Sequence, residues 1–184
     1  PEIVEMLLDQ GFDPMLADSA GNHPFLFACI SNRIDNVKYW LDRFPDWDLE
    51  KPNRLFGGIA LGCAVQMGPD RFELTKLLLK RGSNILMRSH RGSSALQSAC
   101  ENEDADPRVI GLLLNYRCKD KIIINYRRRA CSLKWKAIQT ISVNITRFMR
   151  NPSLLFQFLA AESGATALHF SAKRGDMEIV ELLL

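Results

Sequence analysis

Histidine and cysteine are the residues of this chain best suited to catalysis or metal binding, and their spacing predicts neither. His23 and His169 fall where short helices are expected to begin, which favours structural hydrogen bonds. His90 falls near an expected loop tip, where it could contact a ligand. The chain has 5 cysteines, an odd number, with no CxxC pair and no cluster with histidine. We therefore expect reduced thiols, no metal site and a cytoplasmic or nuclear protein.

Other signatures of catalysis are missing as well. No serine or cysteine lies in a nucleophile motif, and no glycine-rich loop of the phosphate-binding kind occurs. We expect no enzyme in these residues, no cofactor and no small-molecule substrate. Hydrophobic residues make up 47% and charged residues 24%, which is typical of a globular domain. No apolar run approaches the roughly 20 residues that cross a bilayer as a helix, and the first residues lack the basic start of a signal peptide.

A basic segment in an otherwise acidic chain is the feature with the clearest binding chemistry. Between Arg108 and Arg150 there are 11 basic residues and one acidic residue, Asp120, so this stretch carries +10 while the rest carries −7. Residues 117–136 interleave cations with aromatic rings, a pattern that can bind an acidic peptide, an anionic lipid or nucleic acid. The alternatives are a solvated helix face, or cations that neutralise the acidic remainder. The candidate residues for an anionic ligand are Arg127, Arg128, Arg129, Lys134, Trp135 and Lys136.

Internal repetition predicts the elements that position these residues. Four similar segments open at Gly21, Gly57, Gly92 and Gly164, which are spaced 36, 35 and 72 residues apart. Each is followed by a second apolar stretch, such as FELTKLLL at 72–79. A unit therefore predicts a turn, a short helix, another turn and a second short helix. Because one unit cannot bury its own apolar face, stacked neighbours must bury it for one another.

These segments resemble the ankyrin repeat, whose unit of about 33 residues carries a threonine-proline-leucine-histidine-x-alanine signature. The last copy matches best, with Thr166, Leu168 and His169. Equivalent positions elsewhere hold His23-Pro24-Phe25-Leu26, Ile59-Ala60-Leu61-Gly62 and Ser94-Ala95-Leu96-Gln97. The resemblance covers residues 1–118 and 164–184. It implies an all-α solenoid of about five to six stacked helix-turn-helix units with hairpin-like loops.

The resemblance also implies a function, the recognition of another protein or peptide through hairpin tips and the concave face of the first helices. The matching hairpin positions are Asp18, Asn22, Arg54, Arg88, His90 and Arg91, and the first-helix positions are Phe27, Ser31, Gln66 and Ser98. Two alternatives stay open. One is binding of an anionic lipid or nucleic acid through residues 117–136, and the other is an array that only spaces flanking domains.

Residues at helix ends predict how well each unit is formed. Ser94 can cap a helix with its hydroxyl, whereas His23 is a poorer cap and Ile59 offers none. The helix that follows Ile59 is therefore expected to be the least well started. Gly11 and Gly82 follow second helices, where a left-handed glycine commonly ends a helix.

The pattern breaks in residues 119–163. From the last leucine of a unit to the next glycine there are 13 residues in two units but 50 between Leu114 and Gly164. The excess is about one repeat length, so we favour a heavily altered two-helix unit over a disordered or a separately folded insertion. Both ends of the chain cut through a unit. We therefore expect a fragment of a longer protein, with any catalysis outside it.

Overall fold

The computed structural model describes residues 1–116, 124–161 and 163–184, and these residues form an all-helical structure, as expected. The described helices are α1 (Glu2–Asp9), α2 (Pro24–Ile30), α3 (Ile34–Arg43), α4 (Ala60–Gln66), α5 (Phe72–Lys80), α6 (Ala95–Glu101), α7 (Pro107–Asn115), α8 (Leu133–Phe148), α9 (Leu154–Ala161), α10 (Ala167–Arg174) and α11 (Met177–Leu183). An isolated antiparallel bridge joins Arg88 to Ser94. The predicted all-α class is confirmed.

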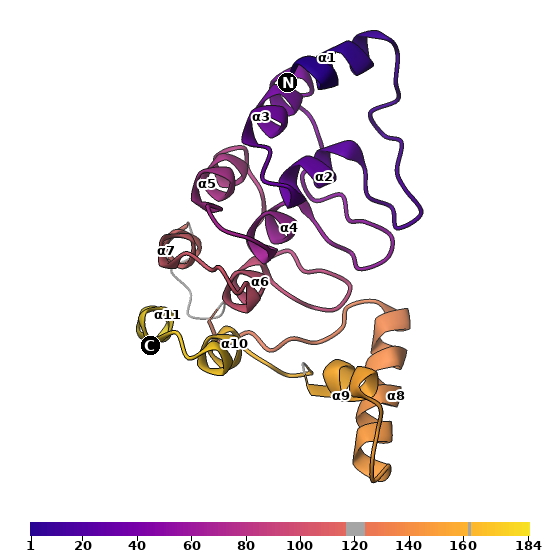
Figure 1. Cartoon of the computed structure of the whole chain (residues 1–184), viewed down its shortest axis with the longest axis vertical. Helices are drawn as coiled ribbons and strands as arrows, with labels where there is room; N and C mark the ends of the chain where they lie inside the picture. Colours follow the sequence, from indigo (N-terminus) through magenta and orange to yellow (C-terminus); the bar gives the residue numbers. More distant parts are fainter. Residues whose placement is uncertain (117–123, 162) are drawn as a thin grey trace.

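The helices pack in pairs that stack into two rows. α2 packs on α3, α4 on α5, α6 on α7 and α10 on α11. An inner row runs α2, α4, α6, α10, and an outer row runs α3, α5, α7, α11, with each helix contacting the next in its row. Figure 1 shows the hairpin loops extending from the inner row, away from the outer row. α1 lies at one end of the stack and has no buried residue.

The repeated positions of the sequence supply the core between the rows. Phe25, Leu61 and Leu96 occupy equivalent places in α2, α4 and α6, and all three are fully buried. Ala64 and Ala99 are buried as well, and their small side chains let neighbouring helices approach closely. Burying one large apolar side chain contributes about 1.5–3 kcal/mol. The stack is therefore held mainly by this repeated apolar pattern.

The ends of the helices follow the sequence at most of these positions. Ser94 caps α6 by accepting a backbone N–H, and Ile59 gives α4 no side-chain cap, as predicted. His23 is a better cap than expected, because its Nδ1 accepts the third backbone N–H after it at 3.2 Å. Gly11 and Gly82 have φ angles of 81° and 97°, which is the left-handed conformation expected after a helix.

Each hairpin loop is closed by the same two backbone hydrogen bonds. The entering residue donates its N–H to the carbonyl of the residue after the loop glycine, and the glycine donates its own N–H back to the entering residue. The entering residues and their glycines are Asp18 and Gly21, Asn53 and Gly57, Ser89 and Gly92, and Arg128 and Gly164. Two or three residues lie inside each of the first three loops, but residues 129–163, 35 in number, lie inside the fourth.

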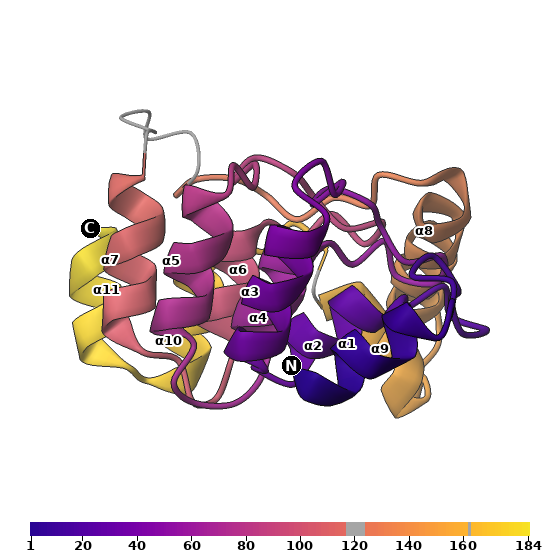
Figure 2. The same cartoon turned by 90° about the horizontal axis from the view of Figure 1, so that it is seen from above.

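The fourth loop contains α8 and α9, which pack on each other outside both rows. Figure 2 shows α8 on the opposite side of the molecule from α7 and α11. Because α10 packs directly on α6 and α11 on α7, no helix pair stands between them in the stack. The altered two-helix unit that the sequence favoured would stand between these two pairs, and α8 and α9 do not stand there. The contacts instead favour an insertion through the tip of a hairpin loop. Of the predicted segment 119–163, residues 119–123 and 162 lie outside the described residues.

Neighbouring hairpin loops are stacked closely and joined through their backbones. The bonds run from the N–H of Leu55 to the carbonyl of Ala20, from His90 to Phe56 and from Cys131 to His90. A Cβ atom on Gly92 would lie 2.0 Å from the carbonyl oxygen of Arg129. The loops therefore form a continuous ladder along one side of the inner row.

Candidate functional site

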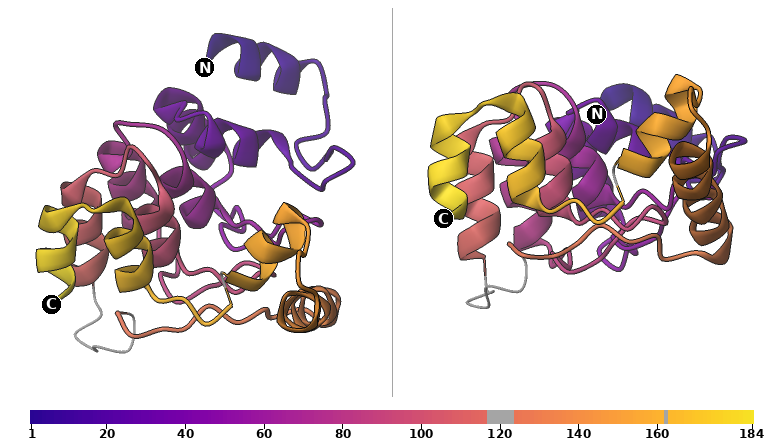
Figure 3. Two further views of the ribbon diagram at one scale, coloured as in Figure 1. Left: turned by 60° about the horizontal axis from the view of Figure 1, so that its bottom comes forward. Right: turned by 90° about the horizontal axis from the view of Figure 1, so that it is seen from below.

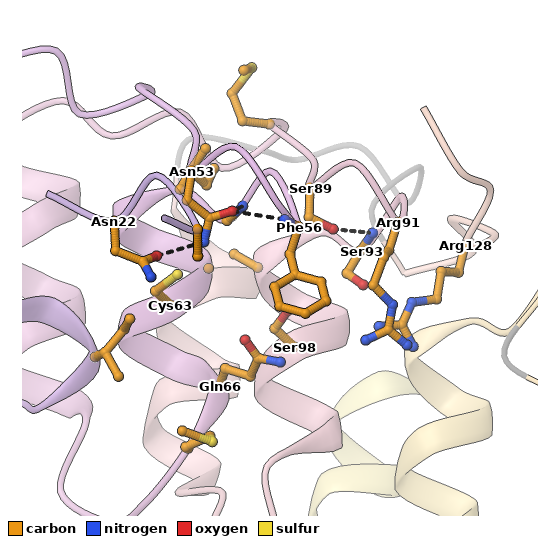
Figure 4. A pocket seen from close by; sticks show the side chains of 18 residues that line it. Asn22, Asn53, Phe56, Cys63, Gln66, Ser89, Arg91, Ser93, Ser98 and Arg128 are labelled. Carbon is orange, nitrogen blue, oxygen red and sulfur yellow. Dashed lines mark hydrogen bonds between the residues drawn. The ribbon is translucent and has the colours of Figure 1, made fainter. Parts of the chain in front are cut away.

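A groove of about 340 Å³ lies between the hairpin loops and the inner row of helices. Figure 4 shows its lining, with Asn53 and Phe56 from a loop, Gln66 from α4 and Ser98 from α6. Gln66 and Ser98 are two of the four first-helix positions predicted to bind a partner. The other two, Phe27 and Ser31, are exposed but do not line the groove.

Apolar side chains make up much of the groove lining. Phe56, Ile59, Met67 and Met87 all contribute to it. Methionine is flexible and polarizable, so it adapts to the shape of what it contacts. Ligand pockets typically measure about 300–1,000 Å³. A groove at the lower end of that range suits one or two side chains of a bound polypeptide.

Asn53 fixes one wall of the groove. Its buried amide donates to Oδ1 of Asn22 at 2.9 Å and accepts the backbone N–H groups of Phe56 at 2.9 Å and Gly58 at 3.1 Å. The side chain of Asn22 in turn donates to Oδ2 of Asp18 at 3.0 Å. Hydrogen bonds from Asn22 lower the pKa of the Asp18 carboxyl, which stays ionised. Asp18 and Asn22, both predicted to bind a partner, therefore also shape the loops.

Two arginines lie at one end of the groove (Figure 4). Arg128 is only 2% exposed, and its guanidinium lies 3.2 Å from the Glu101 carboxylate and 5.2 Å from the ring centroid of Phe170. This burial corrects the prediction that Arg128 belongs to an exposed basic surface. Arg91 is half-buried, with its guanidinium 5.8 Å from the ring centroid of Trp135. Arg91 and Arg128 therefore line the same end of the groove.

The remaining predicted hairpin residues lie on the loops around the groove and do not line it. Arg54 and Arg88 are exposed, and the guanidinium of Arg88 lies 4.6 Å from the ring centroid of Tyr126. His90 is half-buried, and its backbone bonds to both neighbouring loops. Of the six predicted hairpin residues, Asn22 and Arg91 are the two that line the groove.

The first turn of α8 covers part of the hairpin loops. Trp135 donates its Nε1–H to the carbonyl of Leu55 at 3.0 Å, and its ring centroid lies 5.9 Å from that of Phe56. Trp135 therefore makes an internal contact that the basic-aromatic pattern did not predict. Among residues 124–136, the described part of the predicted segment, the exposed cations are Arg127, Arg129, Lys134 and Lys136. Residues 117–123 of that segment lie outside the described residues.

The three buried thiols, Cys29, Cys63 and Cys100, and the buried histidine have environments that suppress reactivity. Burial raises the pKa of Cys63 to about 12 and that of Cys100 to about 11, and it raises the pKa of Cys29 further. Burial lowers the pKa of His23, which favours the neutral ring that caps α2. Within the described ranges, no group of three His, Cys, Asp or Glu residues could hold a metal ion. No helix there is long and apolar enough to cross a membrane.

Several residues that form the groove were absent from the predicted set, including Asn53, Met67 and Met87. Asn53 had a signal in the sequence, because it precedes its loop glycine much as Asp18 and Ser89 precede theirs. The two methionines had none, since Met67 lies directly after α4 and Met87 lies in the loop between α5 and α6, where lining the groove depends on how the loops stack.

A family model described as "Ankyrin repeat" matches residues 163–184. The matched residues contain Gly164 and both helices of the last pair, α10 and α11. This is the copy whose signature is most complete. The match supports the family that the repeated segments resemble, while the number of repeats stays a prediction.

Proposed function

We propose that this chain, whose last helix pair matches the ankyrin repeat, recognises a partner protein through the groove between its hairpin loops and inner row. Ankyrin repeats are in general non-catalytic modules of protein–protein interaction, and the proposal includes no enzymatic activity. The observation that carries it is the buried amide of Asn53, which fixes the groove wall through three hydrogen bonds. A wall that is already ordered loses little conformational entropy when a partner binds.

The groove chemistry indicates the kind of segment that the partner presents. Met67, Met87 and Phe56 favour an apolar side chain. We propose a short exposed stretch of polypeptide that presents such a side chain. The buried thiols support a cytoplasmic or nuclear location as part of the same proposal.

Affinity capture with three matched baits tests this function. Met67→Asp places a charge in the groove, and Met177→Asp is the control on a methionine of similar exposure on α11. We expect the native and Met177→Asp baits to retain the same specific proteins and the Met67→Asp bait to lose them, with unchanged circular dichroism. Retention of those proteins by Met67→Asp would rule out the groove. If the array only holds flanking domains apart, none of the three baits should retain a specific protein.

A further inference from the structure

We propose that the α8–α9 arm (residues 132–161) attaches the protein to bilayer surfaces rich in anionic phospholipid. α8 starts at the hairpin loops, where Trp135 holds it, and has 16 residues, which makes it about 24 Å long. α9 packs back along it. Figures 1 and 3 show the turn between the two helices at the end of the arm away from the hairpin loops. We call residues 148–155 the distal turn.

The distal turn exposes large apolar side chains. Phe148 and Leu154 are 80% and 82% exposed, and Met149 and Leu155 are 54% and 63% exposed. A single exposed apolar residue is ordinary on a protein surface, but four within eight consecutive positions form a cluster that indicates an interaction site. Because the cluster lies at a projecting end, it suits a deformable surface better than a preformed pocket. Entry into the headgroup region of a bilayer would remove these side chains from water.

The charge of the arm specifies which bilayer it fits. Residues 124–161 contain no aspartate or glutamate. Arg147 and Arg150 flank Phe148 and Met149, and both arginines are exposed. The guanidinium of Arg147 lies 5.9 Å from the ring centroid of Phe148, so cation and apolar ring reach the surface together. Each such cation near an anionic leaflet strengthens binding by about fivefold.

The same two properties argue against other occupants of the distal turn. A second copy of the arm would bring like charges together, because the described arm carries cations and no anions. Nucleic acid would pair with the cations but leave Phe148 and Leu154 in water. An anionic lipid surface satisfies both the charges and the apolar side chains. It also leaves the groove accessible, since the distal turn does not contribute to the groove lining.

Vesicle flotation of the 184-residue chain tests the proposal. The probes are vesicles of phosphatidylcholine alone and vesicles that also contain about 30% phosphatidylserine. We expect binding to the anionic vesicles, at least about tenfold weaker binding to the neutral ones, and weakening as salt rises. Phe148→Ser with Leu154→Ser, and separately Arg147→Gln with Arg150→Gln, should each weaken binding by about tenfold or more.

A matched control separates the distal turn from apolar exposure in general. Leu16 and Leu86 are exposed leucines of the repeat array, and their double serine variant should bind vesicles within about twofold of the native chain. In addition, Phe148→Trp should show a blue-shifted emission with anionic vesicles and quenching by brominated lipid. Met67→Asp should leave vesicle binding unchanged, so failure of this proposal is distinguishable from failure of the groove.

Several results would overturn the proposal. The native chain could fail to float with anionic vesicles, or the Phe148→Ser/Leu154→Ser variant, folded by circular dichroism, could float as well as the native chain. Tighter binding to a DNA or RNA duplex than to vesicles would assign the cations to nucleic acid. A dimer in solution that the same double variant dissociates would assign the distal turn to a second copy.

Discussion

Replacing Gly92 by alanine tests the close stacking of the hairpin loops. Gly92 has a φ of 87°, and a Cβ atom there would lie 2.0 Å from the carbonyl oxygen of Arg129. Gly82 is a matched control, because its φ is 97° and its Cβ position has no atom within 4 Å. Both substitutions place alanine in the left-handed region, at a cost of about 1–2 kcal/mol. Only Gly92→Ala must also move a neighbouring loop.

The additional cost at Gly92 arises because the obstructing atoms belong to the backbone and cannot rotate away. Forcing packed backbone to shift costs about 1–3 kcal/mol. The free energy of unfolding should therefore fall by about 2–5 kcal/mol in Gly92→Ala and by about 1–2 kcal/mol in Gly82→Ala. Moving this loop should also weaken the bond between the Cys131 N–H and the His90 carbonyl.

Urea unfolding followed by far-ultraviolet circular dichroism measures both free energies. Hydrogen exchange at the Cys131 amide reports the hairpin ladder separately and should become faster in Gly92→Ala alone. Equal destabilisation by the two substitutions would refute the argument, because it would mean that φ accounts for the whole effect. Unchanged protection of the Cys131 amide would refute the proposed movement of the loop.

Three further predictions follow from buried or docked side chains. Arg128→Gln leaves the Glu101 carboxylate without its ion pair and should lower the free energy of unfolding by about 2–4 kcal/mol, whereas the exposed Arg127→Gln should change it by less than about 0.5 kcal/mol. The pKa of folded His23 lies below the ordinary value of 6.5, so the unfolded chain binds more protons as pH falls. The contribution of neutral His23 to the free energy of unfolding is therefore fully present above about pH 6.5 and is lost as the pH falls below it. Urea titrations near pH 7.5 and 5.5 should show this loss in the native chain and not in His23→Ser. Trp135→Phe removes the donor to the Leu55 carbonyl and should reduce hydrogen-exchange protection in α8 by about 1 kcal/mol, and unchanged protection would contradict that contact.

The inner row was predictable because glycine has the same local role in every unit. Gly21, Gly57, Gly92 and Gly164 all have positive φ angles and close their loops with the same hydrogen bonds. Because this left-handed conformation strongly favours glycine, glycine recurs at the same position of each unit and can be recognised in the sequence. The spacing of these glycines therefore located α2, α4, α6 and α10 before any contact was known.

The path of residues 129–163 was not predictable in the same way. Their number is close to one repeat length, and chain length alone cannot distinguish a stacked unit from an excursion through a loop tip. The burial of Arg128 was not predictable either, because a run of three arginines ordinarily indicates a solvated surface. Arg128 is buried by Glu101 on α6 and Phe170 on α10, which are far from it in the sequence. Only the three-dimensional packing brings these residues together.

The long loop between Arg128 and Gly164 has a consequence for the order in which the stack folds. Gly57 and Gly92 are 35 residues apart, whereas Gly92 and Gly164 are 72 apart, so docking α10 on α6 closes about twice as much chain as docking α6 on α4. The entropy of loop closure grows only with the logarithm of length, and a doubling adds about 0.6 kcal/mol. The array thus accommodates the excursion at little cost in stability. Contacts between distant residues form more slowly, however. The last helix pair should therefore join the stack after its neighbours.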